Sequence, residues 1–266
     1  MVSSRTERAP VWIAGLAAIG AAFFVVPLLG LVVRTPWGDA WRSLTAPETL
    51  DALRLSLVAS LSSTAVALVL GVPLAWVYAR IDFPGRAILR ALTTLPMVLP
   101  PVVGGIALLL AFGRRGLVGS WLDSTFGITL PFSTAGVVFA ETFVAMPFLV
   151  LTVEAGLRSM DRRYEEAARA LGARRWTVLT RVTLPLIAPS LAAGALLCWA
   201  RALGEFGATI TFAGNFPGVT QTMPLAVYLL LETNPNPEGS FILSLILLLV
   251  SLAVLVGLRH RWLGSA

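Results

Sequence analysis

The sequence predicts an all-α fold: an integral membrane bundle of six transmembrane helices with one further, cytoplasmic helix. Of the 266 residues, 57% are hydrophobic and 13% are charged, whereas a soluble domain carries about 25% charged residues. Six apolar segments reach or approach the roughly 20 residues that cross a bilayer as a helix. Lipid offers backbone polar groups no partners, and the segments lack the alternation of a membrane β-barrel, so we expect helices.

The predicted spans form one transmembrane domain over 1–266. They are 11–33, 52–79, 91–112, 133–157, 186–213 and 241–258. The first is longer than the apolar region of a signal peptide and no small-residue cleavage site follows it, so we predict a retained span. The last is marginal in length but uninterrupted.

Two segments depart from a simple spanning helix. The third span contains Pro96, Pro100, Pro101, Gly104 and Gly105. These residues favour kinks, and a broken membrane helix often lines a transport pathway, although membrane helices also tolerate proline and glycine without such a role. The connection 214–240 holds a short apolar piece, Met223 to Leu231, with prolines in and around it. It is too short to cross, so we predict an interfacial or re-entrant segment.

The basic residues predict the orientation. All twenty are arginine, and the net charge is +6. Fourteen lie in the N-terminus, the second and fourth connections and the tail, whereas the opposite side carries Arg34, Arg42, Arg114 and Arg115. Short arginine-rich loops stay in the cytoplasm, so we predict that both termini are cytoplasmic. Because the arginines sit in short loops rather than along one face, nucleic acid binding is not expected.

The sequence lacks the parts of an enzyme. Cys198 stands alone in an apolar run and His260 lies in the tail, and no metal-ligand spacing or acid pair appears. We therefore predict no catalytic residue and no metal site. A channel or secondary transporter is a second alternative, which internal repeats would favour, but none is evident.

The fourth connection, 158–185, predicts a short amphipathic helix. Tyr164, Ala167, Ala168 and Leu171 recur at helical spacing on one face, and the charged residues Arg162, Arg163, Glu165, Glu166 and Arg169 take the other. Asp161 is the candidate N-cap and Gly172 ends the helix. Glu165 precedes Arg169 by four positions, the favourable order for an ion pair.

This loop resembles the EAA loop of prokaryotic ABC-importer permeases. The matching residues are Glu166, Ala167 and Ala168, then Gly172, then Val182 to Pro185. The resemblance implies that the loop docks on a cytoplasmic ATPase subunit. This chain has no phosphate-binding loop, so we expect that subunit to bind ATP and Mg and this chain to bind no cofactor itself. A helix lying on lipid head groups is the alternative. The candidate coupling residues are Tyr164, Glu165, Glu166, Ala167, Ala168, Leu171, Gly172, Leu184 and Pro185.

The end of the fifth span carries charge inside an apolar segment. Arg201 and Glu205 are four residues apart and can neutralise each other, either as a structural pair or as part of a pathway. Gly204 and Gly207 allow close helix approach, and Thr209 and Thr211 are candidate donors for an anion. The candidate pathway residues are Arg201, Gly204, Glu205, Gly207, Thr209, Thr211, Pro100 and Pro101.

The segment 200–228, with 99–105 and 112–116, is similar to the molybdate branch of that permease family. In the sulfate branch we would expect a tyrosine and a serine where this chain has Phe206 and Ala208. Glu141 stands where an amide is expected, and its role is left open. The resemblance implies import of an oxyanion, molybdate being favoured and tungstate or sulfate/thiosulfate being the alternatives. A separate binding protein would set selectivity.

The resemblance also implies partners and a location. Six helices resemble half of such a transporter, so a homodimer is expected. The resemblance implies a location in a prokaryotic inner or plasma membrane. The other expected partners are an extracytoplasmic oxyanion-binding protein and a cytoplasmic ATPase. Arg114 and Arg115 lie on the arginine-poor side and are candidate contacts for an acidic binding protein, although surface arginines are often merely solvated.

Overall fold

The computed structural model describes residues 10–233 and 238–262, and these residues form helices and loops without any strand. The elements in chain order are α1 Val11–Arg34, α2 Ala40–Leu44, α3 Pro47–Arg80, α4 Arg86–Thr94, the 3-10 turn η1 Leu95–Met97, α5 Pro101–Phe112, α6 Gly119–Phe126, α7 Thr134–Ser159, α8 Arg163–Ala170, α9 Arg175–Val178, the π-helical turn η2 Leu179–Thr183, α10 Leu184–Leu186, α11 Ala188–Leu203, α12 Gly207–Ala213, α13 Met223–Thr233 and α14 Glu238–Trp262. The predicted all-α membrane fold is confirmed.

Three single helices, α1, α3 and α7, are long and apolar enough to cross a bilayer. Two bent pairs raise the total to as many as five among the described residues: Arg86–Met97 with Pro101–Phe112, and Arg175–Leu186 with Ala188–Leu203. The predicted span 241–258 falls on α14, whose described apolar part, Glu238–Val254, is shorter than the roughly 20 residues that a crossing needs. The number six therefore stays a prediction.

The third predicted span, 91–112, is not one helix. The chain bends by 119° between its two halves, because Pro100 and Pro101 cannot continue the hydrogen-bonded backbone of the preceding turn. Pro101 instead begins α5, where its fixed φ is compatible with the first helical position. The predicted break is confirmed, and it is far sharper than an ordinary proline kink.

The fifth predicted span, 186–213, also differs from one continuous helix. A 71° bend separates α10 from α11, and a second break at 204–206 separates α11 from α12. Gly204 follows the last residue of α11. The two-break arrangement places Arg201, Glu205 and the start of α12 at a helix junction rather than along one helical face.

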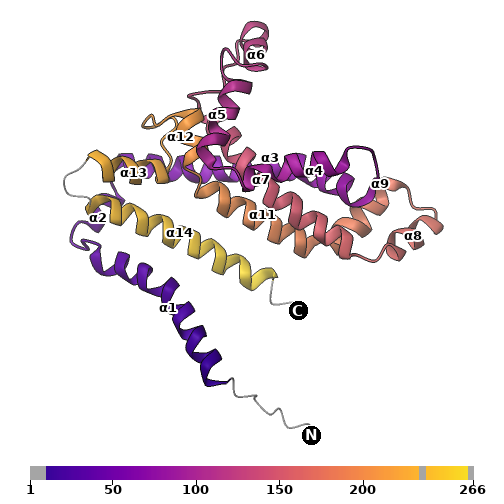
Figure 1. Ribbon diagram of the computed structural model, residues 1–266, viewed down its shortest axis with the longest axis horizontal. Helices are drawn as coiled ribbons and strands as arrows, with labels where there is room; N and C mark the ends of the chain where they lie inside the picture. Colours follow the sequence, from indigo (N-terminus) through magenta and orange to yellow (C-terminus); the bar gives the residue numbers. More distant parts are fainter. Residues whose placement is uncertain (1–9, 234–237, 263–266) are drawn as a thin grey trace.

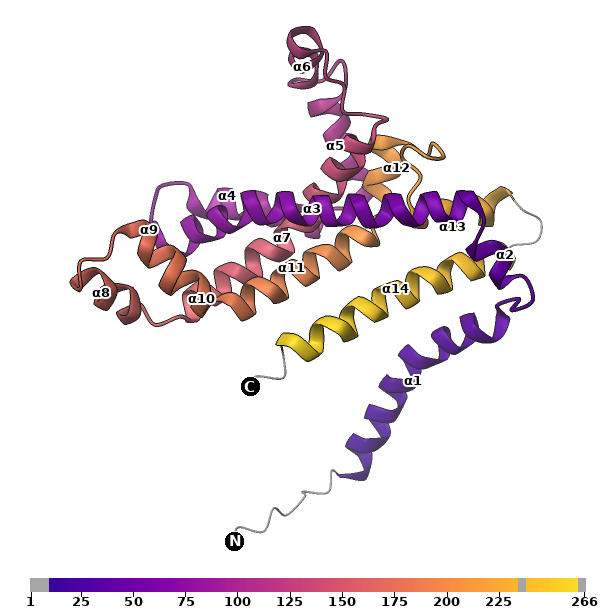
Figure 2. The ribbon, with the colours of Figure 1, turned by 180° about the vertical axis from the view of Figure 1, so that it is seen from behind.

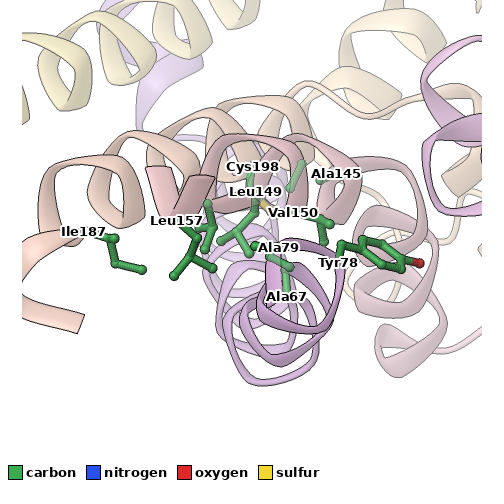
Figure 3. Close-up of a cluster of buried hydrophobic side chains, with 12 residues drawn as sticks. Ala67, Tyr78, Ala79, Ala145, Leu149, Val150, Leu157, Ile187 and Cys198 are labelled. Atoms are coloured by element: carbon green, nitrogen blue, oxygen red, sulfur yellow. The ribbon is translucent and has the colours of Figure 1, made fainter. Parts of the chain in front are cut away.

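The core of the bundle lies between α3, α7 and α11. Figure 3 shows Ala67 and Ala79 of α3 in one cluster of buried side chains with Leu149 and Val150 of α7 and Cys198 of α11. Small residues on α3 allow this approach: a Cβ added at Gly71 would lie 2.9 Å from Cδ2 of Leu149. The helices α3 and α7 are thus closely packed against each other.

Two parts stand away from this core. No residue of α1 is buried, and Figures 1 and 2 show it separated from the α3–α7–α11 unit, with α14 between them. The α5–α6 arm projects from the side of the bundle. Their exposed apolar side chains need lipid or another chain as a neighbour.

Candidate functional site

The helix predicted in the fourth connection is α8. It ends at Ala170, and Gly172 follows in the left-handed region, φ +81°, which a side chain would strain. The N-cap is Arg162 rather than the predicted Asp161, one residue earlier. Asp161 still contributes, because its Oδ1 accepts a hydrogen bond from the backbone N–H of Arg163 at 2.9 Å.

The predicted apolar face of α8 points away from the bundle. Tyr164 is 58% exposed and Leu171 is 88% exposed, and Ala167 is exposed beside them. Trp176, at the start of α9, adds a third large exposed side chain that sequence reasoning missed. We call Tyr164, Ala167 and Leu171 the coupling face, whereas Trp176 lines a cavity with Glu165 and Arg169 on another side of the loop. A surface of this kind, aromatic and aliphatic within an arginine-rich loop, is typical of a protein interface.

Glu165 is buried, although helical spacing groups it with Arg163 and Arg169, which are exposed. Its Oε1 accepts hydrogen bonds from Nη2 of Arg80 at 3.3 Å and from Oγ1 of Thr183 at 2.8 Å. Its Oε2 lies 3.9 Å from Nη2 of Arg169, the predicted i,i+4 partner. Helical spacing alone does not reveal this burial, because Arg80 and Thr183 lie outside the helix that carries Glu165.

A second buried carboxylate lies at the same end of the bundle. Glu154 of α7 is 1% exposed, and its Oε1 accepts from Nε of Arg158 at 2.9 Å while its Oε2 lies 3.1 Å from Nε of Arg90. Arg158 and Arg162 also donate to the carbonyls of Tyr78 and Ala79, at 3.2 and 3.4 Å. These guanidinium groups satisfy the free carbonyls at the end of α3.

Leu184 and Pro185, the end of the predicted motif, form α10 at the bend into α11. Leu184 packs against the main core cluster and Pro185 is exposed. Their position indicates a role in setting the angle between the loop and the fifth span, rather than direct membership of the coupling face.

Arg201 and Glu205 form an ion pair across the end of α11. Nη2 of Arg201 lies 2.6 Å from Oε2 of Glu205, and the side chains are 27% and 1% exposed. Oε1 of Glu205 accepts from the backbone N–H of Ala208 at 2.8 Å. Glu205 therefore neutralises Arg201 and caps the start of α12 with the same carboxylate.

The helices α5 and α12 pack with their backbones in close contact. A Cβ added at Gly207 would lie 2.8 Å from Cβ of Pro101, and one added at Gly105 would lie 2.6 Å from Cβ of Thr211 and 3.0 Å from the carbonyl oxygen of Ala208. The predicted role of Gly207 in close approach fits this packing, and the two broken helices meet at this point. Gly204 does not have the predicted role within this chain: it is exposed, and an added Cβ would meet only the carbonyl oxygen of Ala200, in the preceding helix α11, at 3.7 Å. Pro100, next to Pro101, is exposed.

Replacing Gly105 by alanine is expected to destabilise the protein by about 1–3 kcal/mol, because the added methyl group collides with Cβ of Thr211 and crowds the backbone of Ala208 in α12. Gly104→Ala is the matched control: its Cβ would meet a ring atom of Phe143 at 3.3 Å, with no backbone atom closer. Thermal unfolding in detergent measures both. Equal unfolding midpoints would show that the α5–α12 contact is not close-packed.

The two predicted threonine donors differ. Oγ1 of Thr211 already donates to the carbonyl of Gly207 at 2.8 Å, so its hydrogen serves the helix. Thr209 is fully buried and its Oγ1 lacks a partner in the described part of the chain. Glu141 of α7 is 2% exposed, and its Oε2 likewise lacks a hydrogen-bond partner there. Thr209 is thus the better candidate donor.

Arg114 and Arg115 begin the α5–α6 connection and have different surroundings. Nε of Arg114 donates to Oδ2 of Asp123 at 3.0 Å, and Oγ1 of Thr129 donates to Oδ1 at 3.1 Å. These bonds hold the pKa of the Asp123 carboxyl below its ordinary value. Arg115 is exposed and has no acidic partner within residues 10–233 and 238–262. The same described ranges bring together no group of three or more His, Cys, Asp or Glu that could hold a metal ion.

The helical architecture and the α8 loop define a transport permease, and the chain belongs to the family of binding-protein-dependent transport system inner membrane components, whose model matches residues 53–265. Among the most similar relatives is the molybdenum transport system permease protein ModB of Mycobacterium tuberculosis, 47% identical over 95% of this chain and 94% of that protein. ModB of Escherichia coli is 43% identical over 83% and 95% of the two chains. The Escherichia coli sulfate transport system permease protein CysT is 37% identical over 84% and 81%.

Solved structures confirm the fold. A bacterial ABC transporter involved in the import of alginate superposes with a TM-score of 0.75, 18% identity, and 96% coverage of both chains. The methionine ABC transporter MetNI superposes with a TM-score of 0.59 over 84% of this chain and 100% of that chain, at 17% identity. The family match and the identity to the ModB proteins confirm the resemblance to ABC-importer permeases and to their molybdate branch.

Proposed function

We propose that this chain is the membrane-spanning permease subunit of an ATP-driven importer that carries molybdate into the cell. The observation that carries the proposal is 43–47% identity to molybdenum permeases across most of the chain. The Arg201–Glu205 junction adds chemistry suited to an anion. One Nη2 contact to Glu205 leaves other guanidinium N–H groups available, and the Arg201 side chain is 27% exposed. Loose binding of this kind permits release as well as entry.

ATP hydrolysis belongs to a separate cytoplasmic subunit, which binds ATP and Mg, and the coupling face is its docking surface. Support comes from the exposure of Tyr164 and Leu171 on a loop that the bundle itself leaves uncovered. Arg5 and Arg8 near the start of the sequence and Arg259 and Arg261 near its end favour the cytoplasmic side for both ends. Helix α4 lies near α8 and α9, and α1 and α14 both run back from the α2–α13 end toward that side (Figures 1 and 2). These directions support the proposal that both termini are cytoplasmic.

A second copy of this chain completes the pathway. The outward side of α5 exposes Val102, Val103, Ile106 and Leu110, an apolar surface suited to a symmetric partner. A binding protein outside the membrane delivers the anion. The solved alginate transporter in complex with its periplasmic protein, 18% identical to this chain with a TM-score of 0.73, is an example of such an assembly.

Uptake competition tests the cargo. Proteoliposomes containing the permease, its ATPase and its binding protein are expected to take up labelled molybdate, with unlabelled molybdate competing strongly and sulfate weakly. The second candidate, a sulfate permease, draws on the 37% identity to CysT. Equal or stronger competition by sulfate would replace the molybdate proposal with that candidate. Unlabelled tungstate is tested as a third competitor.

Reversing the charge of Arg115 is expected to slow capture of the loaded binding protein by about tenfold at low salt, with a smaller effect at high salt. Arg115→Glu places a negative charge on the side proposed to receive an acidic protein. Arg174→Glu, an exposed residue of the α8–α9 loop, is the control. Association rates measured with immobilised binding protein decide the matter, and unchanged rates for Arg115→Glu would remove Arg115 from the contact.

A further inference from the structure

Glu165 lies where three separate elements meet. It belongs to α8, its partner Arg80 is the last residue of α3, and its partner Thr183 ends η2, immediately before α10. Arg80 and Glu165 are 85 positions apart in sequence. We call Arg80, Glu165 and Thr183 the Glu165 junction. It connects the helix that carries the coupling face to two parts of the transmembrane unit.

Burial makes this ion pair different from the surface pairs of the same region. The side chains of Arg80 and Glu165 are each 8% exposed, so water screens their attraction little. Glu165 is the single carboxylate within ion-pair distance of Arg80 in the described residues, and Nε of Arg80 is buried without a hydrogen-bond partner. The guanidinium therefore depends on Glu165 for its charge balance.

The helix on the other side of the pair is suited to pass on a displacement. From Arg80 back to Ser56, α3 is one continuous helix of about 36 Å at 1.5 Å per residue. Oγ of Ser56 accepts a hydrogen bond from the backbone N–H of Met223, the first residue of α13, at 2.7 Å. Figure 1 shows α8 and α13 near opposite ends of the molecule. The helix thus reaches from the coupling helix to the far end of the bundle.

The docking surface does not depend on this pair. Tyr164 and Leu171 point outward while Glu165 points inward. The ends of α8 are fixed by Asp161 and by the left-handed turn at Gly172. Removing the charge of Glu165 therefore leaves the surface that an ATPase would contact in place, while it loosens the attachment of that surface to α3.

We propose that Glu165 is a positioning residue that fastens the coupling helix α8 to α3 and η2, so that movement imposed on α8 by the ATPase is passed to the transmembrane helices. This inference rests on the proposed function, because it assumes that α8 receives the ATPase. It adds the residue through which docking becomes movement. The exposed Arg169 contact of Glu165, at 3.9 Å with Arg169 55% exposed, is too screened to serve that role.

The test compares Glu165→Gln with Asp82→Asn in the full complex in proteoliposomes. Glutamine keeps the size of the side chain and an oxygen that accepts from Thr183, and it removes the charge that Arg80 requires. Asp82 pairs with Arg86 in the neighbouring connection but is 97% exposed, which makes it the matched control. The measurements are the affinity for the ATPase, the rate of ATP hydrolysis, and the amount of labelled molybdate transported per ATP.

Glu165→Gln is expected to keep its ATPase affinity and to transport about tenfold less molybdate per ATP, a loss of coupling rather than of binding. Asp82→Asn is expected to match the wild type. Arg80→Lys, which retains the charge, is expected to retain more coupling than Arg80→Gln, and this second pair decides the matter if Glu165→Gln does not fold.

A wild-type ratio of transport to hydrolysis in Glu165→Gln would overturn the inference. So would a parallel loss of ATPase affinity, because Glu165 would then act on docking itself. These results leave the proposed function intact. Failure of the wild-type chain to bind an ATPase would instead overturn the proposed function and this inference together.

Discussion

Replacing Glu205 by alanine is expected to lower the free energy of unfolding by about 3–5 kcal/mol and to abolish molybdate uptake. The substitution leaves Arg201 without its counter-charge and the backbone N–H of Ala208 without its acceptor. Glu205→Gln is expected to lie between alanine and wild type, because the amide oxygen still accepts from Ala208. Denaturant unfolding in detergent and uptake in proteoliposomes measure the two effects.

The double variant Arg201→Met/Glu205→Gln separates a structural pair from a pathway contact. Removing both charges relieves the unpaired buried group, so stability is expected to recover toward wild type. Uptake is expected to stay lost, because we propose that the free N–H groups of Arg201 contact the anion. Recovery of uptake along with stability would show that the pair is structural and that the anion passes elsewhere.

Replacing Leu171 by glutamate is expected to weaken ATPase docking by about 2 kcal/mol or more, roughly thirtyfold, without lowering the stability of the permease. Leu171 is 88% exposed, so it contributes little to folding, and it belongs to the coupling face. A charge placed there meets an apolar partner surface and must lose its water on docking.

Leu117→Glu is the matched control for that measurement. Leu117 is also 88% exposed, but it lies in the α5–α6 connection, away from α8 (Figure 1). Titration of labelled ATPase against each purified variant gives the affinities. Equal affinities for the two variants would place the ATPase contact outside the coupling face.

The loop was the most predictable part of the site, because its information is local. The spacing of Tyr164, Ala167 and Leu171 predicts one helical face, and Gly172 predicts the end of the helix; the structure has both. The burial of Glu165 was not predictable from the spacing, because helical periodicity groups residues by polarity. The burial of this carboxylate depends on Arg80, 85 positions earlier, which no local pattern reports.

The membrane spans were predictable as apolar segments and less so as helices. Pro100 and Pro101 indicate a break, but the bend of 119° at this break depends on what α5 packs against. The break at 204–206 carries no proline, and apolar composition concealed it. Gly204 followed by Glu205 was a signal of this break. Glu205 lies three residues before Ala208, and at that spacing its carboxylate can accept a hydrogen bond from the first turn of a new helix.

The most direct test of the account is uptake of labelled molybdate by proteoliposomes with each component omitted in turn. Uptake is expected when the permease, the ATPase with ATP and Mg, and the loaded binding protein are all present. No uptake is expected when any one of them is missing. Equal uptake by the permease alone, down a gradient and without ATP, would contradict the account and identify the chain as a channel or secondary transporter.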